Sequence, residues 1–242
     1  MDKPIIQVEH EDENSGGLVD RAIADIRTYM RENQMKPGDI LPSENAFALR
    51  LGVSRTVARE AFRALATLRI LEVGNGRKAR VAAPDADAFS MILDHTVYTK
   101  QLSIQQVLDV RRTIELRTAS LAALRRNDDE ARQLLDIVAA MFASLDQPDA
   151  LMGLDIKFHE VIAKASGNSL YSIIVNSFRV ITRQTWHIGW RSRGSFENRQ
   201  ENIKCHERIA MAIAAQDPAR AEAAISEHFD SAVSVLIHAG VT

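Results

Sequence analysis

The sequence predicts a mainly α-helical protein with one small β-hairpin. Capped helical segments recur along most of the 242 residues, and no alternation of apolar and polar residues indicates a strand after residue 84. Residues 74–76, Gly-Asn-Gly, form a strong hairpin signal. The chain is 46% hydrophobic, so it can bury a sizeable core in one or two domains.

Two short helices joined by a tight turn are predicted between residues 42 and 68. Ser43 can cap the first helix, and Gly52 can end it in the left-handed conformation. Ser54 can cap the second helix. This order is the helix-turn-helix pattern. The apolar face of the second helix, which should face a core, consists of Val57, Ala61, Ala64, Leu65 and Leu68.

Basic residues gather on the other side of the second helix and after the hairpin turn. Eight arginine and lysine residues oppose two acidic residues between positions 50 and 80, whereas the whole chain has a formal net charge of −2. Each arginine alone would fit a solvated helix face. Together they suit DNA binding, because cations bind phosphates and arginine forks read guanine edges. The basic residues are Arg50, Arg55, Arg59, Arg63, Arg69, Arg77, Lys78 and Arg80.

The stretch 41–81 resembles the winged helix-turn-helix domain of the GntR family of bacterial transcription regulators. Family motifs Leu-Pro-Ser-Glu, Gly-Val-Ser-Arg and Val-Arg-Glu-Ala start here at Leu41, Gly52 and Ala58, the last replacing the usual valine or leucine. The family often has an arginine after Pro-Ser-Glu, where this chain has Asn45, so a DNA contact there is changed. The resemblance implies DNA binding by Ser43, Asn45, Ser54, Arg55, Thr56, Arg59, Asn75 and Gly76.

The domain plan follows from changes in composition. We expect a flexible acidic tail over residues 1–16, the winged helix-turn-helix domain over 17–83, with its first helix at 18–33, and a helical domain over 84–242. The single cysteine, Cys205, fits a reducing compartment. Because the sequence contains neither a long apolar run nor the apolar core of a signal peptide, we expect a soluble cytoplasmic protein.

The C-terminal region reads as an all-helical bundle of six or seven helices. Ser103, Asp128, Asn168 and Asp217 are candidate N-caps, and Pro218 follows the last of them at the first helical position. The predicted helices cover residues 86–99, 103–126, 128–145, 148–166, 168–188, 196–215 and 217–238.

Four residues of this bundle could share a metal ion. Asp155 and His159 lie four residues apart, on one helix face, and His206 and His228 lie within later helices. One carboxylate and three imidazoles suit zinc, nickel, manganese or iron better than calcium. The alternative interpretation is a set of unrelated histidines in the core or at the surface.

Residues 100–235 resemble the FCD ligand-binding domain, which the FadR branch of the GntR family carries after its winged domain. The matching motifs are Val110-Arg111, an Asp-x-x-x-His pair, Gly167-Asn168 and two later histidines. The resemblance implies a homodimer that binds a pseudo-palindromic operator. It also implies a divalent metal, with zinc favoured, held by Asp155, His159, His206 and His228.

A small carboxylic acid is the expected effector of this domain, with a sugar acid favoured over a fatty acyl thioester. Arginine forks match carboxylates, and aromatic faces suit the apolar side of a sugar ring. The expected effector-binding residues are Arg111, Arg183, Trp186 and Trp190.

A metal-dependent enzyme is the alternative function. It fits the sequence less well, because His159-Glu160 lacks the second histidine of His-Glu-x-x-His: position 163 is Ala163. The sequence also contains neither a Gly-x-Ser-x-Gly nucleophile motif nor a glycine-rich phosphate loop. We therefore expect a transcription regulator, a repressor of a catabolic operon, rather than an enzyme.

Overall fold

The computed structural model describes residues 12–74 and 77–241, with side chains from residue 17 onward. The chain divides into two compact units, Met1–Ala88 and Phe89–Thr242. The expected domain boundary, between residues 83 and 84, falls close to this division. Eleven helices and one two-stranded sheet make up the described part, which confirms the predicted mainly α-helical class.

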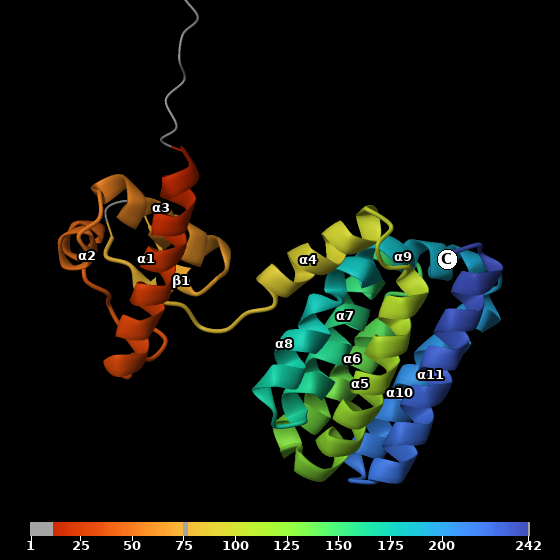
Figure 1. Ribbon diagram of the computed structural model, residues 1–242. Helices are drawn as coiled ribbons and strands as arrows, with labels where there is room; N and C mark the ends of the chain where they lie inside the picture. The colour runs from red at the N-terminus through yellow and green to blue at the C-terminus, as the bar shows by residue number, and fades with distance from the viewer. Residues whose placement is uncertain (1–11, 75–76, 242) are drawn as a thin grey trace, which may run out of the picture. The chain divides into compact units, whose positions relative to one another are not determined.

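The N-terminal unit is a helix-turn-helix followed by a two-stranded wing (Figure 1). Ser43 Oγ accepts a hydrogen bond from the backbone N–H of Ala46, and Ser54 Oγ accepts one from that of Val57, each at 3.2 Å. Gly52 ends the first of these helices in the left-handed conformation, with φ of 66°. The elements of this unit are α1 (Asp12–Glu32), α2 (Glu44–Leu51), α3 (Arg55–Thr67), β1 (Leu71–Glu72) and β2 (Arg80–Val81).

The wing strands pair antiparallel, with Leu71 opposite Val81. Asn75 and Gly76, in the turn between the strands, lie outside the described residues. The first helix starts earlier than the predicted residue 18: α1 begins at Asp12 and includes the last residues of the predicted tail. The apolar core of this unit packs against α3 and leaves the basic N-terminal turn of that helix exposed to solvent. The largest buried side chains of the core are Ile26, Leu41, Phe47, Phe62, Leu65 and Leu71.

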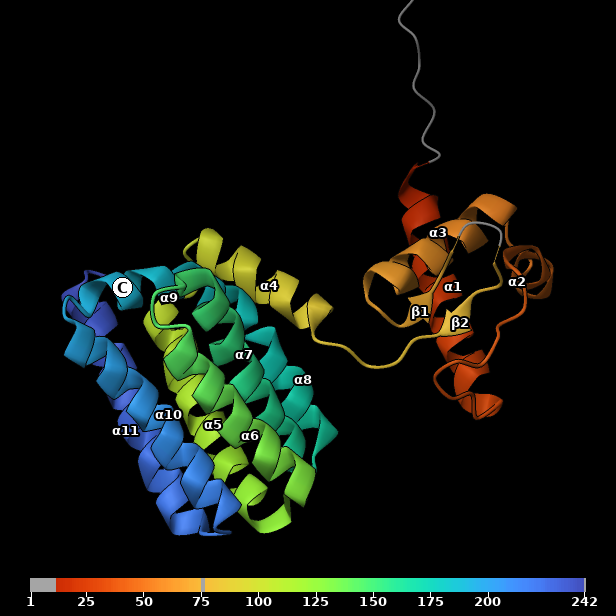
Figure 2. The same cartoon turned by 180° about the vertical axis from the view of Figure 1, so that it is seen from behind.

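The C-terminal unit is a helical bundle, and Figures 1 and 2 show its long helices lying side by side. Capping boxes start two of the helices, one at Ser103, as predicted, and one at Asn127. The predicted cap Asp128 is wrong, because Asn127 accepts from the backbone N–H of Glu130 and Asp128 is the first residue of the helix. The described helices are α4 (Asp87–Tyr98), α5 (Ile104–Arg125), α6 (Asp128–Ala143), α7 (Pro148–Ala165), α8 (Ser169–Ser177), α9 (Arg179–Ser192), α10 (Phe196–Ala214) and α11 (Pro218–His238).

The predicted helix 168–188 is wrong in one respect, because it is two helices that meet at Phe178. Ser177 Oγ donates to the backbone carbonyl of Ile174, and the carbonyl of Ser177 accepts from Ser90 Oγ of α4. These bonds replace helical ones at the junction. Phe178 itself is buried in a small apolar cluster with Val107 and Ile181. The bundle therefore has one helix more than the upper expected number within the described residues.

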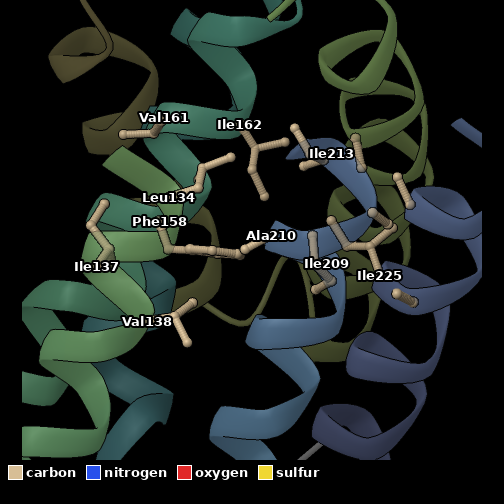
Figure 3. Packing of buried hydrophobic residues seen from close by; sticks show 14 of the residues in the cluster. Leu134, Ile137, Val138, Phe158, Val161, Ile162, Ile209, Ala210, Ile213 and Ile225 are labelled. Carbon is tan, nitrogen blue, oxygen red and sulfur yellow. The ribbon is translucent and has the colours of Figure 1, made fainter. Parts of the chain in front are cut away.

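The main core of the bundle lies between α5, α6, α7, α10 and α11. Figure 3 shows Phe158 and Ile162 of α7 near Ile209 and Ile213 of α10, with Ile225 of α11 beside them. This packing fixes the three helices that carry the predicted metal ligands. Among the described residues, no helix is long and apolar enough to cross a membrane.

Candidate functional site

The four predicted metal ligands come together inside the bundle. Asp155 and His159 lie one turn apart on α7, and His206 and His228 reach them from α10 and α11. One ligand atom from each residue lies within 4.8 Å of those from the other three. All three histidines are buried. In a tetrahedral zinc site the nitrogen and oxygen ligand atoms lie about 3.3 Å apart, so the four ligand atoms of this cluster must move closer together to enclose a metal.

Two ring nitrogens of the cluster support a metal on physical grounds. His159 Nε2 and His228 Nδ1 are buried and have no hydrogen-bond partner among the described residues. A buried polar atom without a partner is costly and needs an explanation. A divalent ion at the centre of the cluster would give both atoms a partner. The donor set of one carboxylate and three imidazoles fits such an ion.

In His206 and in His159, the Nδ1 atom already has a partner. His206 Nδ1 donates to the backbone carbonyl of Asn202 at 2.9 Å, and its Nε2 lies 3.0 Å from Asp155 Oδ1. His159 Nδ1 contacts Glu115 Oε2 of α5. Both Nδ1 contacts are ones in which Nδ1 donates, so a metal can take the Nε2 lone pair of each ring. Without a metal, His206 Nε2 instead donates to Asp155 Oδ1.

Glu115 supports the site, although the sequence analysis did not identify it. Its side chain is fully buried, and its second oxygen accepts from Arg111 Nε at 2.5 Å. Arg111 Nη1 donates to Thr182 Oγ1 of α9 at 2.7 Å. The spacing of Arg111 and Glu115 at i, i+4 was the available signal, but that pattern is common on exposed helix faces.

The charges of the cluster favour metal binding. Burial opposes ionisation of Asp155, but the hydrogen bond from His206 and the nearby imidazoles hold the pKa of Asp155 well below its usual range. Burial, together with the His206 and His159 rings, lowers the pKa of His228 well below its usual 6.5. Asp155 is therefore ionised and His228 neutral, which are the forms that bind a metal.

A cavity of about 70 Å³ adjoins the cluster. Arg111, Trp186 and Trp190, three of the residues predicted to bind the effector, line it, and the two indole rings stack on each other with centroids 5.2 Å apart. The expectation that Arg183 reaches the pocket is wrong. Arg183 is exposed on α9, since the residues of α9 that line the cavity follow another stripe: Thr182, Thr185, Trp186, Gly189 and Trp190.

Two further polar side chains line this cavity without having been identified from the sequence. Asn202 lies on α10, one turn before His206, and Arg193 follows the last residue of α9. Arg112, the neighbour of Arg111, points elsewhere and pairs with Asp230 of α11 at 3.0 Å. Cys205 is buried and accepts from Arg208 at 3.0 Å, which agrees with a packing role.

The candidate DNA-binding residues lie on the first turns of α2 and α3. Arg55, Thr56 and Arg59 are exposed on α3, and Asn45 is exposed on α2. Arg59 Nε lies 3.5 Å from Glu44 Oε2, an exposed pair that phosphate could replace. A groove of about 320 Å³ separates these turns from the wing; its lining includes Ser43, Asn45, Arg59, Arg77 and Lys78.

Comparisons with known proteins agree with this arrangement. Residues 18–81 match "Bacterial regulatory proteins, gntR family", and residues 106–231 match "FCD domain". The HTH-type transcriptional regulator LutR of Bacillus subtilis (strain 168) is 30% identical over 216 residues, which cover 86% of this chain and 95% of LutR.

A repressor and a solved structure are also similar. The HTH-type transcriptional repressor NanR of Salmonella newport (strain SL254) is 27% identical over 222 residues, which cover 89% of this chain and 83% of NanR. The solved structure of Streptococcus agalactiae GntR has a TM-score of 0.64 and 27% sequence identity, covering 88% of this chain and 97% of that one.

Proposed function

The chain belongs to the GntR family of bacterial regulatory proteins and carries an FCD domain, and from this premise we propose that it represses a catabolic operon in response to a small carboxylic acid. Its matched domains and relatives are transcription regulators rather than enzymes. The protein is therefore a DNA-binding transcription regulator. Its place of action is the cytoplasm, where the bacterial chromosome lies.

Operator recognition is assigned to the N-terminal unit. Arg55, Thr56 and Arg59 read base edges from the N-terminal turn of α3, where recognition helices enter the major groove. The capping serines Ser43 and Ser54 hold the helix N-termini, whose backbone amides bind phosphate. A homodimer binds a pseudo-palindromic operator, because half-site symmetry mirrors protein symmetry. Further contacts come from Asn45 and from the wing residues Asn75 and Gly76.

Asp155, His159, His206 and His228 hold a divalent metal, with zinc favoured over nickel, manganese and iron. The unpartnered nitrogens of His159 and His228 support this proposal. A metal held by these four residues would supply a site for a carboxylate oxygen, because four protein ligands would leave positions open on a five- or six-coordinate ion. A metal-dependent enzyme, the alternative considered for this cluster, has no support from the relatives.

The effector occupies the cavity beside the cluster. Arg111 offers a guanidinium group, and Trp186 and Trp190 offer apolar faces. A cavity of about 70 Å³ holds roughly five water molecules, so a compact acid fits it and a fatty acyl thioester does not. A sugar acid stays the favoured class, since hydroxyl and amide groups of Thr182, Thr185 and Asn202 also line the cavity.

The observation that carries this proposal is the buried Asp-His₃ cluster opening onto a cavity that contains an arginine. The test starts with selection of bound sequences from random DNA duplexes. Metal-loaded protein is then titrated with hexonates, hexuronates, lactate and dicarboxylates while operator binding is followed. At least one acid should bind and release the operator. Binding of no acid, or binding that leaves operator affinity unaltered, would remove the effector part of the proposal.

A further inference from the structure

We propose that Arg193 makes the pocket select acids with two carboxylates over acids with one. This inference rests on the proposed function, since it concerns which acid the same cavity takes. The proposed ligand is a compact dicarboxylate, with or without hydroxyl groups. This class includes sugar acids that carry a carboxylate at each end.

Arg193 is held in place at the end of α9. Its backbone N–H and its Nη1 both donate to the carbonyl of Gly189, at 3.3 Å and 3.1 Å. The backbone carbonyl of Arg193 accepts from Arg199 Nε at 3.1 Å, and the Arg199 guanidinium lies over the Trp190 ring, 5.3 Å from its centroid. Hydrogen bonds therefore hold both the backbone and the guanidinium group of Arg193, so its side chain has a fixed position at the cavity.

The two arginines of the cavity differ in how their charge is balanced. Arg111 forms a salt bridge with the fully buried Glu115. Arg193 has no carboxylate within salt-bridge distance among the described residues; the carboxylate that acts on it electrostatically is Asp155. Burial lowers the pKa of Arg193, but a guanidinium stays charged in a protein. A partly buried cation without an ion pair is costly unless an anion joins it.

A count of charges around the cavity favours a dianion. With a divalent metal in the cluster, the histidines are neutral, and the metal and two arginines face only the carboxylates of Asp155 and Glu115. Positive charge then exceeds negative charge by two. One carboxylate leaves half of this excess, whereas two carboxylates remove it.

The arginines also approach from separate places. Arg111 Nη1 donates to Thr182 in the first turn of α9, whereas Arg193 Nη1 donates to the carbonyl of Gly189, seven positions further along the helix, which is about 10 Å of helix. The two guanidinium groups therefore approach the cavity from different turns of α9. A ligand that bridges them needs one acid group at each end.

The test compares acids matched in size on the metal-loaded, full-length protein. Malate is paired with 3-hydroxybutyrate, and glucarate with gluconate, and each Kd is measured by calorimetry. The wild type should bind the better diacid at least roughly tenfold more tightly than its matched monoacid, because a charge-assisted hydrogen bond is added. Arg193→Gln should lose this preference while binding the monoacid as before, and Arg193→Lys should keep part of it.

Arg191→Gln is the matched control. Arg191 lies on the same helix end, is exposed, and likewise donates to the carbonyl four residues earlier, but it does not line the cavity. This variant should keep the wild-type preference. Metal content and melting temperature without acid show whether each variant is folded.

The outcomes separate this inference from the proposed function. If monoacids bind and the wild type shows no preference for diacids, the inference is wrong and the proposed function stands. If Arg193→Gln weakens both kinds of acid equally, Arg193 has a structural role only and the inference is again wrong. If no acid of either kind binds, the effector part of the proposed function fails, and this inference fails with it.

Discussion

The Glu115 carboxylate contacts His159 Nδ1, so that the opposite nitrogen of the same ring points unpartnered into the Asp-His₃ cluster. Carboxylates in this position fix the tautomer and orientation of a ligating histidine and raise its basicity. Arg111 keeps Glu115 ionised in turn: burial opposes ionisation, but Arg111 and His159 lower the pKa of Glu115. One chain of contacts thus joins the cavity arginine to a metal ligand.

Replacing Glu115 by glutamine should weaken metal binding by about 10- to 100-fold, the range typical of such supporting groups. Competition with a fluorescent chelator measures the affinity. Glu160→Gln is the control, because Glu160 follows His159 on α7 but pairs with Lys157 away from the cluster. Equal metal affinity in the wild type and Glu115→Gln would show that Glu115 does not orient the ligand.

Replacing His159, His206 or His228 by alanine should release the metal and remove the stabilisation that the metal gives. That stabilisation is about 2.7 kcal/mol when the free metal exceeds its Kd a hundredfold. Metal analysis of the purified protein and thermal melts with and without added zinc measure both effects. His95→Ala, which changes an exposed histidine of α4, should behave like the wild type. A wild type that holds no metal and gains no stability from zinc or nickel would make the cluster purely structural.

Removing an α3 arginine should weaken operator binding. Arg55→Ala or Arg59→Ala should cost about 1–3 kcal/mol if the side chain reads a guanine edge. Fluorescence anisotropy at one fixed salt concentration measures the loss. Arg132→Ala on α6 removes the same charge from an exposed position of the other unit and should change affinity little. Wild-type operator affinity in both α3 variants would refute the assignment.

Arg111→Lys should weaken acid binding by roughly tenfold or more, because lysine keeps the charge and loses the planar fork. Lysine is preferable to alanine here, since alanine would leave Glu115 buried without its cation. Arg112→Lys is the matched control, because Arg112 is the next residue and pairs with Asp230 instead. An Arg111→Lys variant that holds its metal and binds acids like the wild type would exclude Arg111 from the effector site.

Much of the fold could be predicted from local signals in the sequence. The capping serines, Gly52 and Pro218 mark helix ends through their own backbone chemistry. The break at Phe178 could not be predicted, because neither glycine nor proline marks it and the Ser90–Ser177 hydrogen bond at the junction joins distant parts of the chain. Such tertiary contacts leave no local pattern.

The candidate metal ligands could also be predicted from the sequence, but two features of the adjoining cavity could not. The spacing of Asp155 and His159 indicated a shared helix face, and the family resemblance joined them to His206 and His228. Arg193 was not predictable, because it follows the end of α9 in a connection without periodicity. Arg183 was misplaced because adjacent helical positions point about 100° apart, and the sequence alone did not fix which face of α9 lines the cavity.

We propose that an acid bound beside the metal cluster controls operator binding. The most direct measurement is the operator Kd of metal-loaded protein with increasing acid, compared with metal-free protein and Arg111→Lys. Acid should weaken operator binding by about 5- to 150-fold in the metal-loaded wild type, and by much less in the metal-free protein and in Arg111→Lys. The operator should weaken acid binding by the same factor. An acid that binds the metal-loaded protein and leaves the operator Kd unchanged would contradict the claim.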